Sequence, residues 1–317
     1  MNRHTFSSKQ NGLTLIELLI AMAIGLIVVI AATATLMLSQ QGFRSVDAAS
    51  QLRDNARFAS EIVRRVILQA GYLGTEFSIQ RGHGFNLGGS LEASPPNIQG
   101  INNSRFDKLP SITEKSSTPG EKNSDVLIVR YQPGDNSDMA LIDCLGNSDN
   151  STIKHSSERI GSIFHIQNSS LMCSRIAADG TLTGTAQPLI EGVESFQVLY
   201  GTYLVKANEE PENLPTDAVS QAPDAYLRAD ELIVDNNPSA TLANWERVRS
   251  IRIGMILRSA ENVATNESNT AEIFYPFGSS FMASDSDPGS QLSITPDGRL
   301  RQVVNFTVHL RNPQGTI

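Results

Sequence analysis

An uninterrupted apolar segment near the N-terminus constrains this chain more than any other feature. Residues 13–38 read LTLIELLIAMAIGLIVVIAATATLML, which is 26 residues with one charged side chain, Glu17. At about 1.5 Å of rise per residue, a helix of this length spans roughly 39 Å, more than the roughly 30 Å of a bilayer's hydrocarbon core. We therefore expect one membrane-spanning helix at 13–38.

The flanking residues predict how that helix is oriented. Residues 1–12, MNRHTFSSKQNG, contain Arg3 and Lys9 and no acidic residue. A positive flank favours the cytoplasmic side, so we expect everything after residue 38 to be exported. A secretory signal has a shorter apolar region with its cleavage site behind it. Here Gly12 precedes the apolar segment, and cleavage at this junction would leave the hydrophobic helix on the mature protein.

Glu17 is the one ionisable side chain inside the apolar segment. A carboxylate deep in a membrane helix costs on the order of 3 kcal/mol, so such a residue indicates a function. The alternative is a plain signal anchor with an incidental acid.

Residues 9–18, KQNG followed by LTLIEL, resemble the leader of type IV prepilins and of type II secretion pseudopilins. The resemblance implies that a prepilin peptidase cleaves between Gly12 and Leu13 on the cytoplasmic side and methylates the new amino terminus. It also implies that Glu17 acts in assembly by pairing with the α-amine of Leu13 in a neighbouring subunit. The residue after the cut is usually Phe in this family. Leu13 departs from that pattern, which indicates a minor rather than a major subunit.

A second pattern extends the helix beyond the membrane. Residues 13–70 contain no proline, and Gly71 supplies a stop signal. Apolar side chains recur every three or four residues in 39–70, with charged side chains on the remaining faces. The expected buried stripe comprises Val46, Ala49, Leu52, Ala56, Ala59, Val63, Val66 and Ala70. We expect one helix of 58 residues, with Gly25 and Gly42 as points of bending or local unwinding.

In residues 71–317 the sequence pattern is different, with short strand-like runs between long polar loops. Residues 78–124 are rich in Gly, Ser, Asn and Pro, which predicts an irregular excursion that can include short strands. Strands are expected at 125–131, 140–145, 162–167, 171–176, 194–200, 248–258 and 301–311. A short helix or turn is expected at 225–232, and hairpin turns at Asp179-Gly180 and Pro296-Asp297-Gly298. The predicted fold is α+β and pilin-like, with an antiparallel sheet laid on the second half of the helix.

Three segments of the head carry a narrower resemblance. GVESFQVLYG at 192–201, WERVRSIRI at 245–253 and FTVHLRN at 306–312 are similar to segments of PilW-type minor pilins. Similar segments occur in the J-type pseudopilin of type II secretion. Residues 78–124 and 202–240 carry no such resemblance.

Composition and motifs argue against catalysis and against nucleic-acid binding. The net charge is −8 and the isoelectric point is about 5.2, whereas a nucleic-acid binder needs a basic footprint. The sequence has no Gly-x-Ser-x-Gly elbow, no His-Glu-x-x-His, no phosphate loop and no Cys-x-x-Cys. We therefore expect a protein that is not an enzyme.

Weaker candidates for ligand sites have simpler explanations. Gly82-His83-Gly84 with Gly88-Gly89 neither follows a clear strand nor opens a helix, which favours a flexible loop over a phosphate cradle. The Asp-rich runs 135–138 and 285–287 lack the EF-hand spacing and are read as turns. The five histidines are scattered along the chain: His4, His83, His155, His165 and His309. No metal or cofactor is expected.

The two cysteines, Cys144 and Cys173, lie in predicted strands of the exported part, where the compartment should be oxidising. We expect them to form a disulfide that closes a loop of about 30 residues and stabilises the fold by roughly 3–4 kcal/mol. Two separate buried thiols are the alternative.

Together these features predict a minor type IV pilin of the PilW family. The organisation would be a leader at 1–12, a transmembrane and fibre-core helix at 13–38, its amphipathic continuation at 39–70, and a periplasmic head at 71–317. The resemblance implies a structural subunit that helps initiate or cap the pilus. Its implied partners are the prepilin peptidase, other minor pilins, the major pilin, a tip adhesin, and inner-membrane lipid before assembly. The alternatives are a type II secretion pseudopilin, a competence pseudopilus subunit and a signal-anchored periplasmic enzyme.

Overall fold

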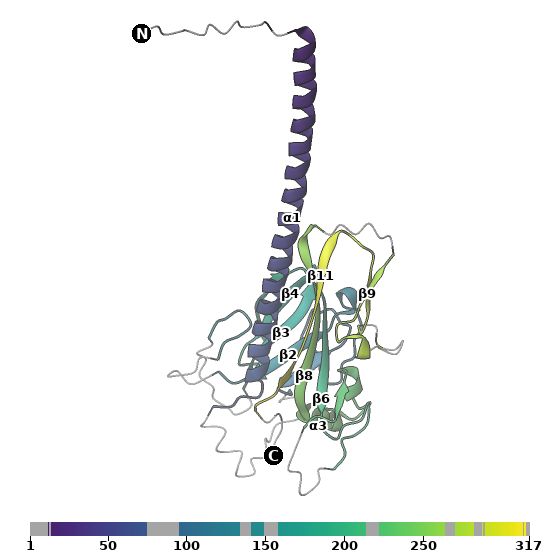
Figure 1. Ribbon diagram of the computed structural model, residues 1–317. Helices are drawn as coiled ribbons and strands as arrows, with labels where there is room; N and C mark the ends of the chain where they lie inside the picture. The colour runs from purple at the N-terminus through teal and green to yellow at the C-terminus, as the bar shows by residue number, and fades with distance from the viewer. Residues whose placement is uncertain are drawn as a thin grey trace, which may run out of the picture.

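The protein combines one long N-terminal helix with a β-rich head (Figure 1). The computed structural model describes residues 12, 14–74, 95–133, 141–148, 158–213, 222–263, 270–281, 287, 289–312 and 314.

The helix α1 (Leu15–Gln69) is a single element of 55 residues, which confirms the predicted continuous helix. It passes through Gly25 and Gly42 without interruption, so neither glycine unwinds it. The first half stands clear of the head in Figure 1, and the second half lies against it. Its buried positions are Ala48, Leu52, Ala56, Ala59, Ile62, Val63, Val66, Ile67 and Gln69.

The predicted stripe on α1 is wrong at its start. Val46 is 71% exposed, and burial begins at Ala48. Six residues rotate a helix by about 600°, so Val46 points about 120° away from Leu52 and misses the face that meets the head. The stripe from Leu52 onward follows the predicted spacing.

The first sheet has five antiparallel strands in the order β1-β2-β3-β4-β5. They are β1 (Ile98–Ile101), β2 (Val126–Tyr131), β3 (Ile160–Gln167), β4 (Ser170–Ile176) and β5 (Leu182–Glu191). Asn168 and Ser169 both have φ of +53° in the β3–β4 turn, which is the backbone of a two-residue hairpin loop. Gly180, at φ +83°, forms the β4–β5 turn, as predicted for Asp179-Gly180.

The second sheet has four antiparallel strands in the order β11-β8-β6-β7. They are β6 (Val193–Thr202), β7 (Ala225–Leu227), β8 (Val248–Asn262) and β11 (Arg299–His309). A two-stranded ribbon, β9 (Glu272–Phe274) with β10 (Leu292–Ile294), packs beside it. The predicted turn at 296–298 exists, with Gly298 at φ +72°, but it joins β10 to β11, and these two strands pair with others.

Short helices complete the head between these strands. They are α3 (Pro238–Glu246) and the 3-10 turns η2 (Glu121–Asn123), η3 (Asp230–Leu232) and η4 (Ser279–Phe281). The predicted helix or turn at 225–232 is therefore a strand followed by a 3-10 turn. The irregular excursion at 78–124 contains β1 and η2 in its described part.

The predicted strand at 140–145 is wrong in its described part, residues 141–145. Residues 141–148 form a turn with one β-bridge, between Ile142 and Ser148. The Asp143 carboxylate accepts hydrogen bonds from the backbone N–H groups of Leu145 and Asn147, at 2.8 and 2.9 Å. An aspartate side chain that accepts hydrogen bonds from backbone N–H groups of the residues after it favours a turn over a strand.

The two sheets and α1 enclose the main hydrophobic core, with Trp245, Tyr131, Tyr200, Phe164 and Phe196 as its largest fully buried side chains. The helix packs across β11 and β8 and also contacts β2 and β5. The single predicted sheet is thus two sheets that share this helix.

The chain crosses from one sheet to the other at Gly192, between β5 and β6. Gly192 has φ of +83°, and a Cβ there would lie 2.6 Å from the carbonyl oxygen of Arg258. Both the backbone angle and the space therefore require glycine at this corner.

Asp125 also joins the two sheets. It precedes β2, and its carboxylate accepts hydrogen bonds from the backbone N–H groups of Asn103 and Val198, each at 2.8 Å. Burial raises the pKa of Asp125 to about 8, against the effect of these two hydrogen bonds. The side chain ties the start of β2 to the middle of β6.

A buried carboxylate anchors the strands near the Gly192 corner. The Glu194 side chain is 1% exposed and contacts Arg301 Nε at 2.7 Å, Lys122 Nζ at 2.5 Å and Arg258 Nη1 at 3.4 Å. Arg301 also binds Asp297 at 2.8 Å. This cluster connects β6, β8, β11 and η2.

The C-terminal end of α1 is closed by the segment that follows β11. Asn312 Nδ2 donates to the carbonyl oxygen of Ala70 at 3.0 Å, and Gln314 Nε2 donates to the same oxygen at 3.5 Å. Gly71 N donates to the carbonyl of Arg130 at 3.0 Å. The bonds from Asn312 and Gln314 satisfy a carbonyl group that the end of a helix leaves unpaired.

Candidate assembly surface

The first turn of α1 is a capping box formed by Thr14 and Glu17. The Glu17 N–H donates to Thr14 Oγ1 at 3.4 Å, and Glu17 Oε2 accepts from both Thr14 N and Thr14 Oγ1 at 3.0 Å. This reciprocal arrangement satisfies N–H groups that a helix start leaves unpaired. Within the described chain, Glu17 therefore has a partner of its own.

Thr14 is a residue that the sequence interpretation missed. The signal was present, because Thr-x-x-Glu ahead of an apolar run is the sequence pattern of a capping box. Gly12 is exposed next to this cap. Leu13, the predicted first residue of the mature protein, lies outside the described residues, and so do Gly82-His83-Gly84 and Gly88-Gly89.

The first half of α1 exposes a continuous apolar surface. Its large side chains are more than half exposed, from Leu15 at 78% through Leu38 at 70% to Phe43 at 73%. An 18-residue stretch of this helix has a mean hydropathy of 2.8, and none of that stretch is buried. The helix is therefore long and apolar enough to cross a membrane. A soluble protein rarely exposes an apolar patch of this size, which marks a membrane or protein contact.

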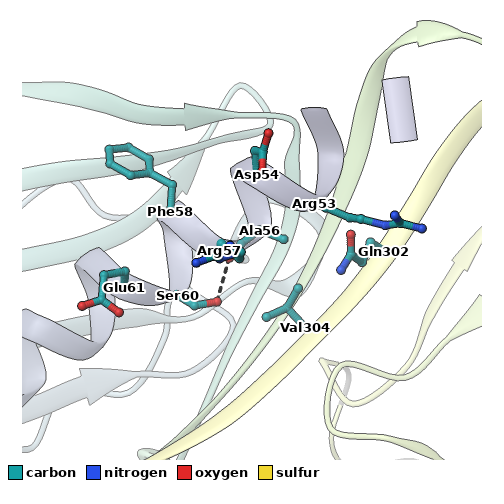
Figure 2. Close-up of a pocket in the computed structure, with 9 residues that line it drawn as sticks. All are labelled: Arg53, Asp54, Ala56, Arg57, Phe58, Ser60, Glu61, Gln302 and Val304. Carbon is teal, nitrogen blue, oxygen red and sulfur yellow. Dashed lines mark hydrogen bonds between the residues drawn. The ribbon is translucent and has the colours of Figure 1, made fainter. Parts of the chain in front are cut away.

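Where α1 reaches the head, an open groove of about 770 Å³ lies between the helix and β11. Figure 2 shows Arg53 extending toward β11 beside Gln302, with Phe58 projecting on another side of the helix. The full lining is Arg53, Asp54, Ala56, Arg57, Phe58, Ser60, Glu61, Gln302 and Val304. The strand β11 is an edge of its sheet, so the groove runs beside a sheet edge.

Cys144 and Cys173 form a disulfide with their Cα atoms 6.0 Å apart, which confirms the predicted pairing. Cys173 is in β4, and Cys144 is in the turn at 141–148. The backbone N–H of Cys144 donates to Ser162 Oγ at 3.1 Å. Arg175 in β4 pairs with Asp143 of the same turn. The bond thus fastens the turn to the five-stranded sheet.

The disulfide should be detectable in mature protein. Non-reducing mass spectrometry is expected to give a linked peptide that contains Cys144 and Cys173. Replacing both by Ser should lower the free energy of unfolding by roughly 3 kcal/mol, because the reduced chain regains the entropy of the open loop. Two freely alkylated thiols in the native head would contradict the pairing.

No group of metal-ligating side chains is found among the described residues. His165 is buried beside Ser174 Oγ at 3.2 Å, and burial lowers its pKa to about 4. A neutral imidazole packed against Phe106 is a core side chain. The Asp-rich run 135–138 lies outside the described residues, as do His4, His83 and His155.

Comparison with known protein families gives two matches. Residues 153–312 match the family described as Type IV Pilus-assembly protein W, PilW. Residues 7–33 match the family described as Prokaryotic N-terminal methylation motif, which covers Gly12, Leu13 and Glu17.

Comparison with curated proteins gives no match. Among solved structures, the type IV-like pilin TTHA1219 from Thermus thermophilus is 14% identical to this chain. The match covers 83% of this chain and 98% of that one, with a TM-score of 0.39.

Proposed function

Because this chain belongs to the PilW family of type IV pilus-assembly proteins, we propose that it is a minor pilin, a structural subunit that helps initiate or cap the pilus. It would first be held in the inner membrane by residues 13–38, with the head in the periplasm, and afterwards be part of the fibre. Its partners would be the prepilin peptidase, other minor pilins, the major pilin and a tip adhesin.

One observation carries the proposal: the methylation motif opens a helix whose first half is exposed and, apart from Glu17, predominantly apolar. In a membrane that surface would contact lipid, and in a fibre it would contact the corresponding helices of other subunits. Both environments are apolar, so the same helix can move between them without exposing its surface to water.

Glu17 would set the position of the helix within the fibre. We expect its carboxylate to pair with the α-amine of Leu13 in a neighbouring subunit, where the surroundings are apolar. The capping box supports this role, since both Thr14 bonds go to Oε2 and hold the carboxylate at the tip of the helix. Sliding one helix past the other would separate the two charges.

Processing gives the first test. We expect cleavage between Gly12 and Leu13, because the peptidase needs a residue without a side chain beside the membrane face. Intact-mass analysis of fibre-associated protein should show an N-methylated Leu13 at the N-terminus, and Gly12→Asp should leave the precursor uncut. Fibre-incorporated protein that still begins at Met1 would contradict the proposal.

A type II secretion pseudopilin and a competence pseudopilus subunit would have the same leader, helix and head. Deleting the gene and scoring surface piliation, twitching, secretion and DNA uptake separately distinguishes them. Loss of piliation and twitching alone is the expected result. A signal-anchored enzyme is the remaining alternative, and no catalytic motif in the sequence favours it.

A further inference from the structure

Of the four edge strands of the two large sheets, three are protected against pairing with another strand, and β11 is not. β1 and β7 are only four and three residues long. β5 contains Pro188, and its register with β4 shifts twice. Short edges, prolines and irregular registers all hinder the addition of a further strand. β11 has 11 residues, contains no Pro, Gly or Lys, and keeps one register with β8 from Arg301 to His309.

The hydrogen-bond pattern shows which main-chain groups of β11 face outward. Leu310 N donates to the carbonyl oxygen of Arg249 at 2.9 Å, one step beyond the last register pair of β11 and β8. Antiparallel strands alternate between bonded and non-bonded pairs, so the even-numbered residues of β11 bind β8. The N–H and C=O groups of the odd-numbered residues therefore point away from the sheet, at Val303, Asn305, Thr307 and His309.

These outward groups are open to another molecule. Asn305 and His309 are exposed, and Val303 and Thr307 are half-buried. Within the part of the chain that the structure describes, the outward main-chain groups have no hydrogen-bond partner. They recur at every second residue, about 6.8 Å apart, which is the spacing that an added β-strand satisfies.

The groove between α1 and β11 gives an added strand room for its side chains. Gln302 and Val304 of β11 form one wall, and Arg53, Ala56 and Phe58 of α1 belong to the other (Figure 2). Successive side chains of a strand point to opposite faces, so every second side chain of an added strand would enter this groove. Further side chains of α1 bring mixed charges to its middle: Asp54, Arg57 and Glu61.

The charges at the two ends of the edge indicate which kind of strand fits. β11 has no charged side chain from Gln302 to Val308. Arg53 lies beside Gln302 at one end of this neutral stretch (Figure 2), and Arg311 follows the other end. Neither arginine makes an ion pair with a described residue. A strand with acidic side chains near both of its ends complements this pattern.

A second copy of this chain fits the edge poorly. α1 and β11 run in the same direction along the head (Figure 1), and the segment after β11 is bonded to the end of α1. A two-fold axis would join two copies of β11 in antiparallel order, so their α1 helices would point in opposite directions and could not enter the same membrane. Pairing centred on Asn305 would also place Arg299 of each copy opposite Arg311 of the other, and like charges in that position are destabilising.

We propose that the free edge of β11 binds an extended segment of a different protein, with acidic ends, as an added β-strand. The main chain of that segment would pair with residues 303–309, and its acidic ends would lie toward Arg53 and Arg311. In strand addition, main-chain hydrogen bonds supply affinity, while side-chain contacts supply the choice of partner. This surface is separate from the apolar half of α1 and from Glu17, and only the exclusion of a second copy rests on the proposed pilin function.

Photo-crosslinking of the full-length protein in the cells that produce it tests for an added strand. A photoreactive residue is placed in turn at Asn305, Thr307 and His309, where a residue of the added strand would lie about 5 Å away. We expect one segment of another protein, in which the crosslinked position shifts by about two residues with each step along β11. Gln187, exposed on the edge strand β5, is the matched control and should not crosslink to that segment. Crosslinks to a second copy, crosslinks without the two-residue shift, or none above the control would overturn the proposal.

A proline on the edge tests the main-chain hydrogen bonds. Asn305→Pro removes one outward N–H and keeps the bonds to β8, because an edge strand tolerates proline where its N–H faces solvent. The crosslink yield from His309 should fall by about fivefold, the effect of losing one main-chain hydrogen bond. Asn305→Thr keeps the N–H and should leave the yield unchanged. Equal yields from the two variants would contradict strand addition.

Arg311→Glu tests the charge without altering the strand itself. The crosslink yield from Thr307 should fall by about threefold, because an attraction becomes a repulsion at an exposed position. Arg105→Glu makes the same change of charge elsewhere on the surface of the head and should have no effect. Equal yields from both variants would show that the bound segment is not acidic at that end. The pilin function fails separately, if processed wild-type protein is absent from sheared fibres.

Discussion

Glu17→Leu is expected to reduce the fraction of the protein found in sheared fibres by about tenfold or more, while export, cleavage and head folding remain intact. Removing one partner of a buried ion pair strands the other at a cost on the order of 3–5 kcal/mol. Here the stranded group would be the α-amine of Leu13 in a neighbour. The measurement is the ratio of membrane-held to fibre-associated protein for each variant.

Thr14 separates the two roles that Glu17 can have. Thr14→Val removes the hydroxyl that caps α1 but keeps the carboxylate, and Glu17→Gln keeps the hydrogen bond but removes the charge. We expect Thr14→Val to be incorporated nearly as well as wild type, Glu17→Gln to resemble Glu17→Leu, and Glu17→Asp to be partly tolerated. If Thr14→Val fails as Glu17→Leu does, the carboxylate acts only as a helix cap.

Glu194→Gln is expected to lower the free energy of unfolding by about 3–5 kcal/mol, because it leaves the cations around a buried position uncompensated. Glu191→Gln, on the exposed end of β5, is the matched control and should change it by less than about 0.5 kcal/mol. Trp245 is the only tryptophan and is buried against Tyr200, so its fluorescence reports unfolding of the head.

The effect of Glu194→Gln should depend on pH in a definite direction. Burial alone would raise the pKa of Glu194, but hydrogen bonds from Arg301 and Lys122 and their charges outweigh burial and lower it below 4.5. A lowered folded pKa gives stability that is present above the unfolded pKa and is lost as the pH falls through the folded value. The difference in the free energy of unfolding between wild type and Glu194→Gln should therefore become smaller below about pH 4.5. A difference that becomes larger in acid would contradict the lowered pKa of Glu194.

The sequence predicted the helix well because two independent signals agree over its length. The apolar segment is long, and the buried stripe from Leu52 keeps the spacing of three or four residues. The error at Val46 has a physical origin, since periodicity shows which residues share a face but not where the head begins to cover that face.

Most of the strands that were predicted have mainly buried side chains, and the exception is β11, whose side chains are mostly half-buried. β2, β3, β4, β6, β8 and β11 all fall on predicted segments. β5 was missed because it is an edge strand with mostly exposed side chains, and Gly184 and Pro188 interrupt its pattern. α3 was missed although Asn237-Pro238 is a helix-start signal, with Asn237 as the N-cap.

The candidate assembly surface was only partly predictable from sequence. The leader motif predicts roles for Gly12, Leu13 and Glu17, because it is a local string of residues. The groove and the free edge of β11 were not predictable, since they require α1 to meet a strand about 240 residues later in the chain.

The hydrogen bonds from Asn312 and Gln314 to Ala70 have a consequence for how the protein is made. The bond from Asn312 spans 242 positions of the chain, so the end of α1 stays open until the segment after β11 is in place. Contacts this distant in sequence form late and slow the folding of a domain. On the proposed topology, the helix would therefore already sit in the bilayer while its head is still an open chain exposed to periplasmic proteases and chaperones.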